Sequence, residues 1–176
     1  MSWPRRAAAL LVTAVVLAVL GGCGFSSLYA KREAVPVVAE LEQIRITPIE
    51  NRVGQIVHNS LLDLLNPRGR PARPRYELQV TLRENIARLA VERNAFATRA
   101  NLNLHASFLL TDRATGQRLY SSRDTVIGSY NLYDSDFATL SAERDARRRA
   151  ALEISQIIRT KLAAYFSQTH DRRGRS

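Results

Sequence analysis

The sequence predicts an α+β fold: a two-layer sandwich in which two helices pack on one face of a mostly antiparallel four-stranded sheet, in the order βαβββα. Three consecutive stretches between residues 76 and 130 alternate apolar and polar residues, as strands with one buried face do. Residues 51–66 and 134–166 carry apolar residues at helical spacing, and a short alternating stretch precedes them. Strands and helices of this kind bury their apolar faces against each other in two layers.

The first strand and the first helix are predicted between residues 44 and 67. Residues 44–48 alternate, and Pro48 restricts this strand to a sheet edge or ends it. Asn51 is a suitable N-cap, and Asn66-Pro67 ends the helix. The apolar stripe of this helix consists of Val53, Ile56, Val57, Leu61 and Leu64. Residues 68–75, rich in Arg and Pro, form a loop.

The three long strands follow without a break. Residues 76–83 alternate cleanly and extend toward Val91, and residues 99–110 give the most regular alternation in the chain. Residues 112–116 form a hairpin loop, in which Gly116 can adopt a positive φ. Residues 119–130 form the last strand, with less regular alternation. Because the links are short, an antiparallel meander is the expected topology.

The last helix follows the N-capping residues Asp134-Ser135-Asp136. Its predicted inner stripe is Phe137, Leu140, Ala146, Ala150, Ile154, Ile157, Ile158, Leu162 and Tyr165. The alanines would let the helix backbone lie close to the sheet. Three i,i+4 pairs are expected on its outer face, namely Glu143–Arg147, Asp145–Arg149 and Arg149–Glu153. The arginines at 144 and 147–149 are likewise expected on this exterior, paired with carboxylates.

The N-terminus has the features of a secretory signal. Arg5 and Arg6 precede an apolar stretch over residues 7–20, which is shorter than the about 20 residues of a membrane-spanning helix. Leu20-Gly21-Gly22-Cys23 then resembles a bacterial lipobox, with cleavage between Gly22 and Cys23. Cys23 would carry a thioether-linked diacylglycerol and, on its new amine, an acyl chain; such anchors hold stably when two or more chains are present. The alternative is a buried free cysteine in an uncleaved anchor.

The residues around this cysteine resemble a known family. Gly22-Cys23-Gly24-Phe25-Ser26-Ser27-Leu28-Tyr29 is similar to the opening of LptE, the lipopolysaccharide-assembly lipoproteins, and most of all to short alphaproteobacterial members. The order strand, helix, three strands, helix is also the order of that family. Gly24 stands where an Asp would favour retention in the inner membrane. We therefore expect a protein anchored by lipid to the cell outer membrane, on its periplasmic side and in a barrel lumen.

The sequence is accordingly divided into four parts. Residues 1–22 are expected to be the signal peptide, and residues 23–40 a lipidated tether. Residues 41–166 would form one α+β domain, and residues 167–176 a basic, disordered tail. With 176 residues there is room for one domain of ordinary size.

Composition and motifs bear on the function classes. The chain has 26 Lys+Arg against 16 Asp+Glu, which predicts attraction to polyanions; a GC-rich genome would equally explain an excess of Arg. One cysteine and three separated histidines argue against a metal site, and no nucleophile or nucleotide-binding motif is present. Asn101, Asn103 and His105 give one strand a polar face without stacking aromatics, which disfavours nucleic-acid binding. We expect no enzyme activity and no cofactor beyond the lipid on Cys23, and interpret His105 as a hydrogen-bonded surface residue.

The resemblance implies the partners. LptE proteins sit as a plug inside the LptD barrel, help it assemble and bind lipopolysaccharide. Arg93, in a stretch similar to the family's lipopolysaccharide-contacting loop, is the main candidate, with Arg88 and Arg99 beside it. Ala95 replaces a Gly of that loop, and a second basic contact, a Lys early in the last helix, has no match near Ala142. The alternative is another outer-membrane lipoprotein, acting as a general barrel-assembly or transport accessory.

Overall fold

The computed structural model describes residues 37–89 and 99–173. One helical turn over residues 37–41 precedes six further elements. These are β1 (Ile44–Ile46), α3 (Asn51–Leu65), β2 (Tyr76–Leu89), β3 (Arg99–Asp112), β4 (Arg118–Asn131) and α4 (Asp136–Arg173). Gly22, Cys23 and Arg93 lie outside the described residues, so the predictions on them stay predictions.

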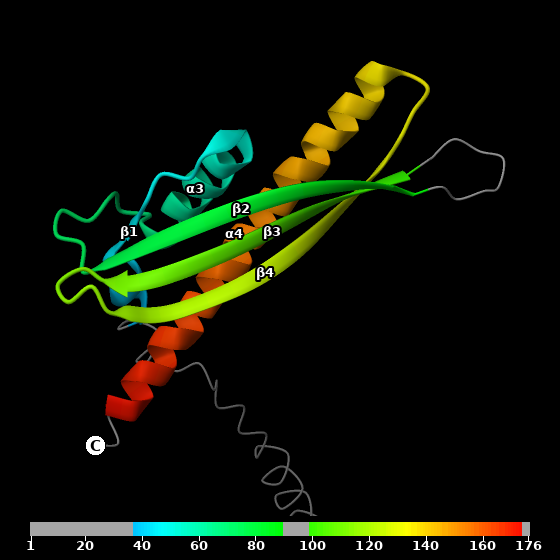
Figure 1. The fold of residues 1–176 in the computed structure, drawn as a ribbon. Coiled ribbons are helices and arrows are strands. Elements are labelled where there is room, and N and C mark those ends of the chain that lie inside the picture. The colour runs from blue at the N-terminus through cyan, green and yellow to red at the C-terminus, as the bar shows by residue number, and fades with distance from the viewer. Residues whose placement is uncertain (1–36, 90–98, 174–176) are drawn as a thin grey trace, which may run out of the picture. The chain divides into compact units, whose positions relative to one another are not determined.

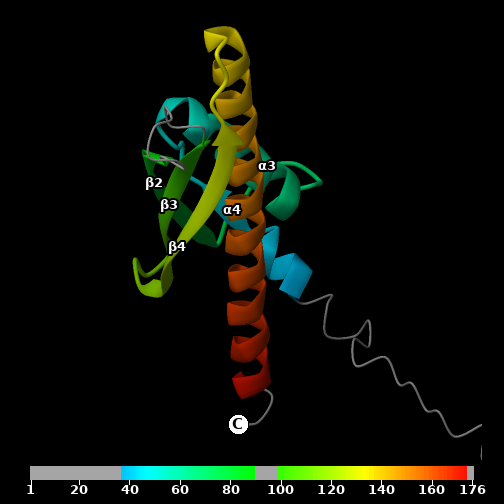
Figure 2. The same cartoon turned by 90° about the vertical axis from the view of Figure 1, so that its right-hand side faces the viewer.

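The four strands form one sheet in the order β1-β2-β3-β4. Strand β1 pairs with β2 in parallel, and α3 makes the crossover between them. The β2–β3 and β3–β4 pairs are antiparallel. Figure 1 shows the three long strands side by side, and Figure 2 shows α3 and α4 on the same side of the sheet. The predicted fold class, two helices on one face of a mostly antiparallel four-stranded sheet, is therefore confirmed.

The helix-facing side of the sheet consists of the even-numbered residues of β2, β3 and β4. In β3 this alternation is complete, since every even-numbered residue from Ala100 to Leu110 is at most 3% exposed. The facing residues of α3 and α4 complete the core, which also includes Ile44, Val57, Leu61, Leu65, Leu78, Val126, Ala146, Ala150, Ile154, Ile158 and Leu162. The odd-numbered face has no helix over it among the described elements.

The start of α3 is set by an asparagine with an unusual backbone. Asn51 has φ of +66°, a conformation that Asn tolerates better than most residues, and Glu50 before it is extended. Asn51 Oδ1 accepts a hydrogen bond from the Gly54 backbone N–H at 2.9 Å. The side chain thus makes the capping contact that the sequence predicts, although the helix is counted from Asn51 itself.

Both ends of the domain differ from the predicted boundaries. Residues 37–40, assigned to the tether, belong to a helical turn whose Glu40 carboxylate accepts a hydrogen bond from Tyr76 Oη at 2.8 Å. Helix α4 continues to Arg173, through most of the segment 167–176 expected to be disordered. Glu40 also lies 3.7 Å from His170 Nε2, so the two ends of the described chain meet.

Aromatic side chains explain why the second half of α4 stays packed. Phe166 lies 5.1 Å from Tyr76 between ring centroids, and Tyr165 lies 5.3 Å from Tyr120. Phe108 extends the cluster from β3. These rings join α4 to β2 and β4 at Tyr165, the last predicted stripe residue, and at the residue after it. Aromatic pairs stabilise by about 0.5–1.5 kcal/mol beyond their buried area.

The first turns of α4 are more exposed than the sequence predicts. Phe137 and Leu140, predicted as inner-stripe residues, are 80% and 43% exposed. The prediction was wrong because apolar spacing places residues on one helix face but does not show where the sheet beneath that face ends. No helix among residues 37–89 and 99–173 is long and apolar enough to span a bilayer.

Candidate functional site

The candidate site is the end of the sheet where Leu89 of β2 pairs with Arg99 of β3. We call this the distal end. Strand β4 reaches it at Asn131, which pairs with Arg99, and α4 begins a few residues later. The opposite, proximal end carries the α3–β2 loop and the β3–β4 turn (Figure 1).

Two of the three predicted arginines lie at the distal end, on opposite faces of the sheet. Arg88 pairs with Ala100, which in turn pairs with Tyr130, so Arg88 shares the helix-facing side with Tyr130. Arg99 pairs with Leu89 on the open side, because neighbouring residues of a strand alternate between faces. Both arginines are exposed. The strands thus bring the pair to one end without placing both on one surface.

Exposed apolar side chains occur toward this end on β2, on β4 and at the start of α4. Leu89 is 41% exposed and Ile127, on the open face, is 59% exposed. Tyr133 and Phe137, between β4 and the first turn of α4, are 53% and 80% exposed. Together with Ile86 and Leu140 they make the distal end amphipathic, with guanidinium groups beside apolar surface.

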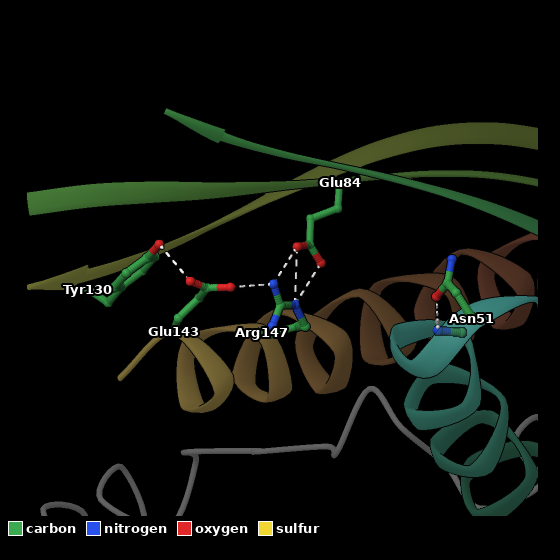
Figure 3. A network of polar contacts seen from close by, with 6 residues as sticks. Asn51, Glu84, Tyr130, Glu143 and Arg147 are labelled. Carbon is green, nitrogen blue, oxygen red and sulfur yellow. Dashed lines mark hydrogen bonds and ion pairs between the residues drawn. The ribbon is translucent and has the colours of Figure 1, made fainter. Parts of the chain in front are cut away.

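A polar network fixes α4 to the sheet below this end. Arg147 of α4 donates to Glu84 of β2, with Nε–Oε2 at 2.9 Å and Nη2–Oε1 at 2.7 Å. Arg147 Nη2 also donates to Glu143 Oε1 at 2.7 Å, and Tyr130 Oη donates to Glu143 Oε2 at 3.4 Å. Figure 3 shows the chain of contacts from Tyr130 through Glu143 and Arg147 to Glu84.

The network changes the acid–base behaviour of two groups. Hydrogen bonding to Glu84 raises the pKa of Arg147 further above its usual range, so this guanidinium stays charged. Burial raises the pKa of Tyr130, and the Glu143 carboxylate raises it further, while Arg88 partly offsets the effect. Tyr130 therefore holds its proton and remains a hydrogen-bond donor.

This network differs from what the sequence predicts. Arg147 was expected on the helix exterior, yet its side chain is only 22% exposed and faces the sheet. The Glu143–Arg147 and Asp145–Arg149 ion pairs are confirmed. The sequence signal for the network is Glu84, a charged residue at an even-numbered position of β2. Asp124 of β4 is a second case, and it contacts Lys161 Nζ at 2.6 Å.

Helix α4 lies very close to β4 at one point. A Cβ built on Gly128 would come within 3.0 Å of the Ala146 carbonyl oxygen, and Ala146 itself is fully buried. This contact confirms the prediction that small residues let the helix backbone approach the sheet.

The open face of the sheet is largely polar over β3 and β4. His105 Nδ1 lies 2.8 Å from Thr125 Oγ1, which confirms its interpretation as a hydrogen-bonded surface residue. Ser129 Oγ donates to Asn101 Oδ1 at 2.7 Å. Within residues 37–89 and 99–173, no three His, Cys, Asp or Glu side chains come together as a metal site would require.

The fold and the distal end together define a two-layer α+β domain with an amphipathic end. The family model LptE, described as lipopolysaccharide-assembly, matches residues 41–162. This chain therefore belongs to the LptE lipopolysaccharide-assembly family, as its opening residues suggested. A search of curated proteins finds no match.

Solved structures share the fold. A putative lipoprotein from Caulobacter crescentus CB15 is 23% identical, with a TM-score of 0.63 over 77% of this chain and 98% of that one. The rare lipoprotein B from Shewanella oneidensis is 9% identical, with a TM-score of 0.58 over 72% and 98%. A minor lipoprotein from Acinetobacter baumannii is 19% identical, with a TM-score of 0.54 over 70% and 92%.

Proposed function

We propose that this protein is an outer-membrane lipoprotein, anchored through Cys23, that plugs the LptD barrel, helps it assemble and binds lipopolysaccharide in transit to the cell surface. Membership of the lipopolysaccharide-assembly family over residues 41–162 is the observation that carries the proposal. We propose no enzyme activity and no cofactor besides the covalent lipid.

The distal end supports the lipopolysaccharide part of the proposal. Lipopolysaccharide presents phosphates beside acyl chains, and this end presents Arg88 and Arg99 together with the exposed Leu89, which pairs with Arg99. Guanidinium groups bind phosphates through paired, charge-assisted hydrogen bonds. Arg93 lies between the two strand ends in the sequence, so we include it in this site.

The lipopolysaccharide arm is tested by titrating the full chain, in detergent at constant salt, with lipopolysaccharide. Arg93→Asp and Arg88→Asp should each weaken binding by about fivefold or more, because a charge-assisted contact is replaced by repulsion. Arg148→Asp is the matched control, since Arg148 is an exposed residue of α4 outside the proposed site. Equal losses in all three variants would reduce the effect to net charge and contradict a site at the distal end.

The LptD arm is tested separately by tagging the protein in its native host. Co-purification with LptD supports the proposed role, and recovery of other envelope partners without LptD would favour a general assembly accessory. Depletion of the protein should also lower the amount of folded LptD and make the surface permeable to bulky hydrophobic compounds. Unchanged LptD folding and permeability would contradict the proposal.

A further inference from the structure

The α3–β2 loop, residues 66–75, concentrates positive charge at the proximal end. It contains four arginines, Arg68, Arg70, Arg73 and Arg75, and no acidic residue. All four are exposed, and the side chain of Arg68 is 82% exposed. Arg70 and Arg73 are each followed directly by a proline, which restricts the backbone of the residue before it. This restriction lowers the conformational entropy that the loop loses when its guanidinium groups bind a partner.

Contacts at both ends of the loop hold it against the first residues of the domain. Arg68 Nη1 lies 3.2 Å from Glu42 Oε2. At the other end of the loop, the Arg75 backbone N–H donates to the Gln43 carbonyl at 3.1 Å. The arginines therefore lie beside the start of the described domain, which is the end of the domain that the chain reaches from Cys23.

The carboxylates around this loop already have partners. Three glutamates lie within 3.8 Å of an arginine nitrogen, namely Glu40, Glu42 and Glu77. Asp112 accepts hydrogen bonds from the backbone N–H groups of Ala114 and Thr115 in its own turn. Arg70 and Arg73, by contrast, have neither an ion pair nor a side-chain hydrogen bond within the part of the chain that the structure describes. Their charges are therefore available to an anionic partner outside the domain.

The length of chain before the domain limits how far this end can lie from a membrane. Residues 23–36 separate the expected acylated cysteine from the described domain, and a fully extended chain of this length spans at most about 50 Å. A contact between the loop and the same membrane is then favoured by a high effective concentration, so that a weak contact suffices. Arginines near an anionic bilayer surface supply such a contact, and their attraction falls off within about one Debye length.

We propose that the α3–β2 loop binds the anionic phospholipid surface of the bilayer that holds the Cys23 anchor, with Arg70 and Arg73 as the main contacts. This contact turns the proximal end toward the bilayer. The distal end points away from it, because β2 alone extends over 14 residues, or about 45 Å. The proposal rests on the lipid anchor of the proposed function and not on lipopolysaccharide binding, since Arg88 and Arg99 lie at the other end of the sheet.

The proposal is tested with the acylated protein in vesicles of phosphatidylcholine, with or without phosphatidylglycerol. Cys23 is the one cysteine of the chain and acylation uses its thiol, so a fluorophore at Ala72→Cys labels the loop alone. Nitroxide groups on the lipid headgroups quench this fluorophore when the loop touches the bilayer. Quenching should be about twofold or more stronger with phosphatidylglycerol, and about 1 M salt, with a Debye length of about 3 Å, should remove the difference. A fluorophore found on Cys23 by mass spectrometry would instead contradict the lipid anchor, and the loop proposal would fall with it.

Two double variants of the labelled protein separate the loop from net charge. Arg70→Gln/Arg73→Gln should lose most of the quenching that depends on phosphatidylglycerol. Arg144→Gln/Arg148→Gln, which removes two exposed arginines of α4, should retain it, and a fluorophore at Asn131→Cys, at the distal end, should show no such dependence. Equal losses in both double variants, or equal quenching with and without phosphatidylglycerol, would overturn the proposal. Quenching that requires added LptD would assign the loop to a protein partner and overturn it as well.

Discussion

Arg147 of α4 and Glu84 of β2 form a two-pronged ion pair across the interface between the last helix and the sheet, 63 residues apart in the chain. Each side chain is about three-quarters buried, at 22% and 25% exposure. Because Arg147 also contacts Glu143, one guanidinium compensates two carboxylates that otherwise face each other. The pair therefore fixes how α4 lies against the sheet below the distal end.

Removing this guanidinium should destabilise the domain. We expect Arg147→Met to lower the free energy of unfolding by about 1–2 kcal/mol, between the values for exposed and fully buried pairs, since Glu84 and Glu143 are left to repel each other. Urea unfolding of the full chain measures this loss. Arg148→Met, an exposed neighbour, is the control and should change stability by less than about 0.5 kcal/mol. Equal stability of the two variants would show that the pair contributes nothing.

The tyrosine at the end of this network predicts a pH dependence. Burial raises the pKa of Tyr130 above its usual 10.0, so in alkali the unfolded chain loses this proton before the folded chain does. The unfolded state then binds fewer protons, and stability falls as the pH rises from about 10 toward the folded pKa. Tyr130→Phe removes that contribution. The stability gap between wild type and Tyr130→Phe should therefore shift in favour of the variant between about pH 8 and pH 11; a constant gap would contradict the prediction.

The beginning of α3 contains a glycine that cannot be replaced without a clash. A Cβ on Gly54 would lie 2.7 Å from Ile49 Cγ2 and 2.9 Å from the Ile49 carbonyl oxygen. Alanine usually stabilises a helix relative to glycine by about 1 kcal/mol, but here we expect Gly54→Ala to destabilise by about 1–3 kcal/mol. Thermal unfolding gives the sign. Asn59→Ala, exposed on the same helix, should be close to neutral, and a stabilised Gly54→Ala would show that Ile49 moves aside.

Asn51 combines a capping bond with a positive φ, and two substitutions separate these contributions. Asn51→Gly keeps the backbone conformation and loses the side-chain bond to Gly54, at a cost of a few tenths of a kcal/mol up to about 1 kcal/mol. Asn51→Ala loses the bond and also strains the backbone, so we expect a cost of about 1–3 kcal/mol. Chemical unfolding of both variants should rank alanine below glycine. The reverse order would exclude backbone strain at this position.

The lipid anchor gives the fifth prediction. Cys23→Ser should abolish acylation and leave the unprocessed precursor, because the lipobox chemistry needs a thiol. Mass spectrometry of protein purified from membranes measures both changes. A wild-type protein with a mature but unacylated N-terminus would contradict the lipobox. Function should survive in part, since contacts with a barrel would retain a plug without its lipid.

The sheet was predictable because apolar and polar residues alternate along its strands, as they do when every second side chain of a strand is buried. Helix α4 was predictable in its middle, where the stripe residues Ala146, Ala150, Ile154, Ile158 and Leu162 are buried, and not at its start. Phe137 has the same spacing as the buried residues, but the sheet does not extend beneath it. The point at which a helix extends past the sheet depends on tertiary structure, and the spacing of apolar residues in the helix does not indicate it.

The polar contacts of the candidate sites were less predictable. Arg147 stands among consecutive arginines, and which of them meets the sheet depends on helix rotation within about one turn. A cavity beside β1 is lined by Arg45, Arg70 and Arg113, which are distant in sequence and which only the folded chain brings to one end of the sheet. Arg88 and Arg99 were predicted from the sequence as candidate site residues. Their separation onto opposite faces of the sheet follows from the register of β2 and β3.

Glu84 and Asp124 affect the edge strands of the sheet as well as the position of α4. Strand β4 is one edge of the sheet, and β2 is a second exposed edge beyond Leu78, where its pairing with the short β1 stops. Long open edges invite strands from other molecules, and inward-pointing charges are one of the ways in which natural sheets resist aggregation. A slip of either strand by one residue would also move its carboxylate to the other face, away from Arg147 or Lys161. Each ion pair thus favours the strand register in which its carboxylate faces α4.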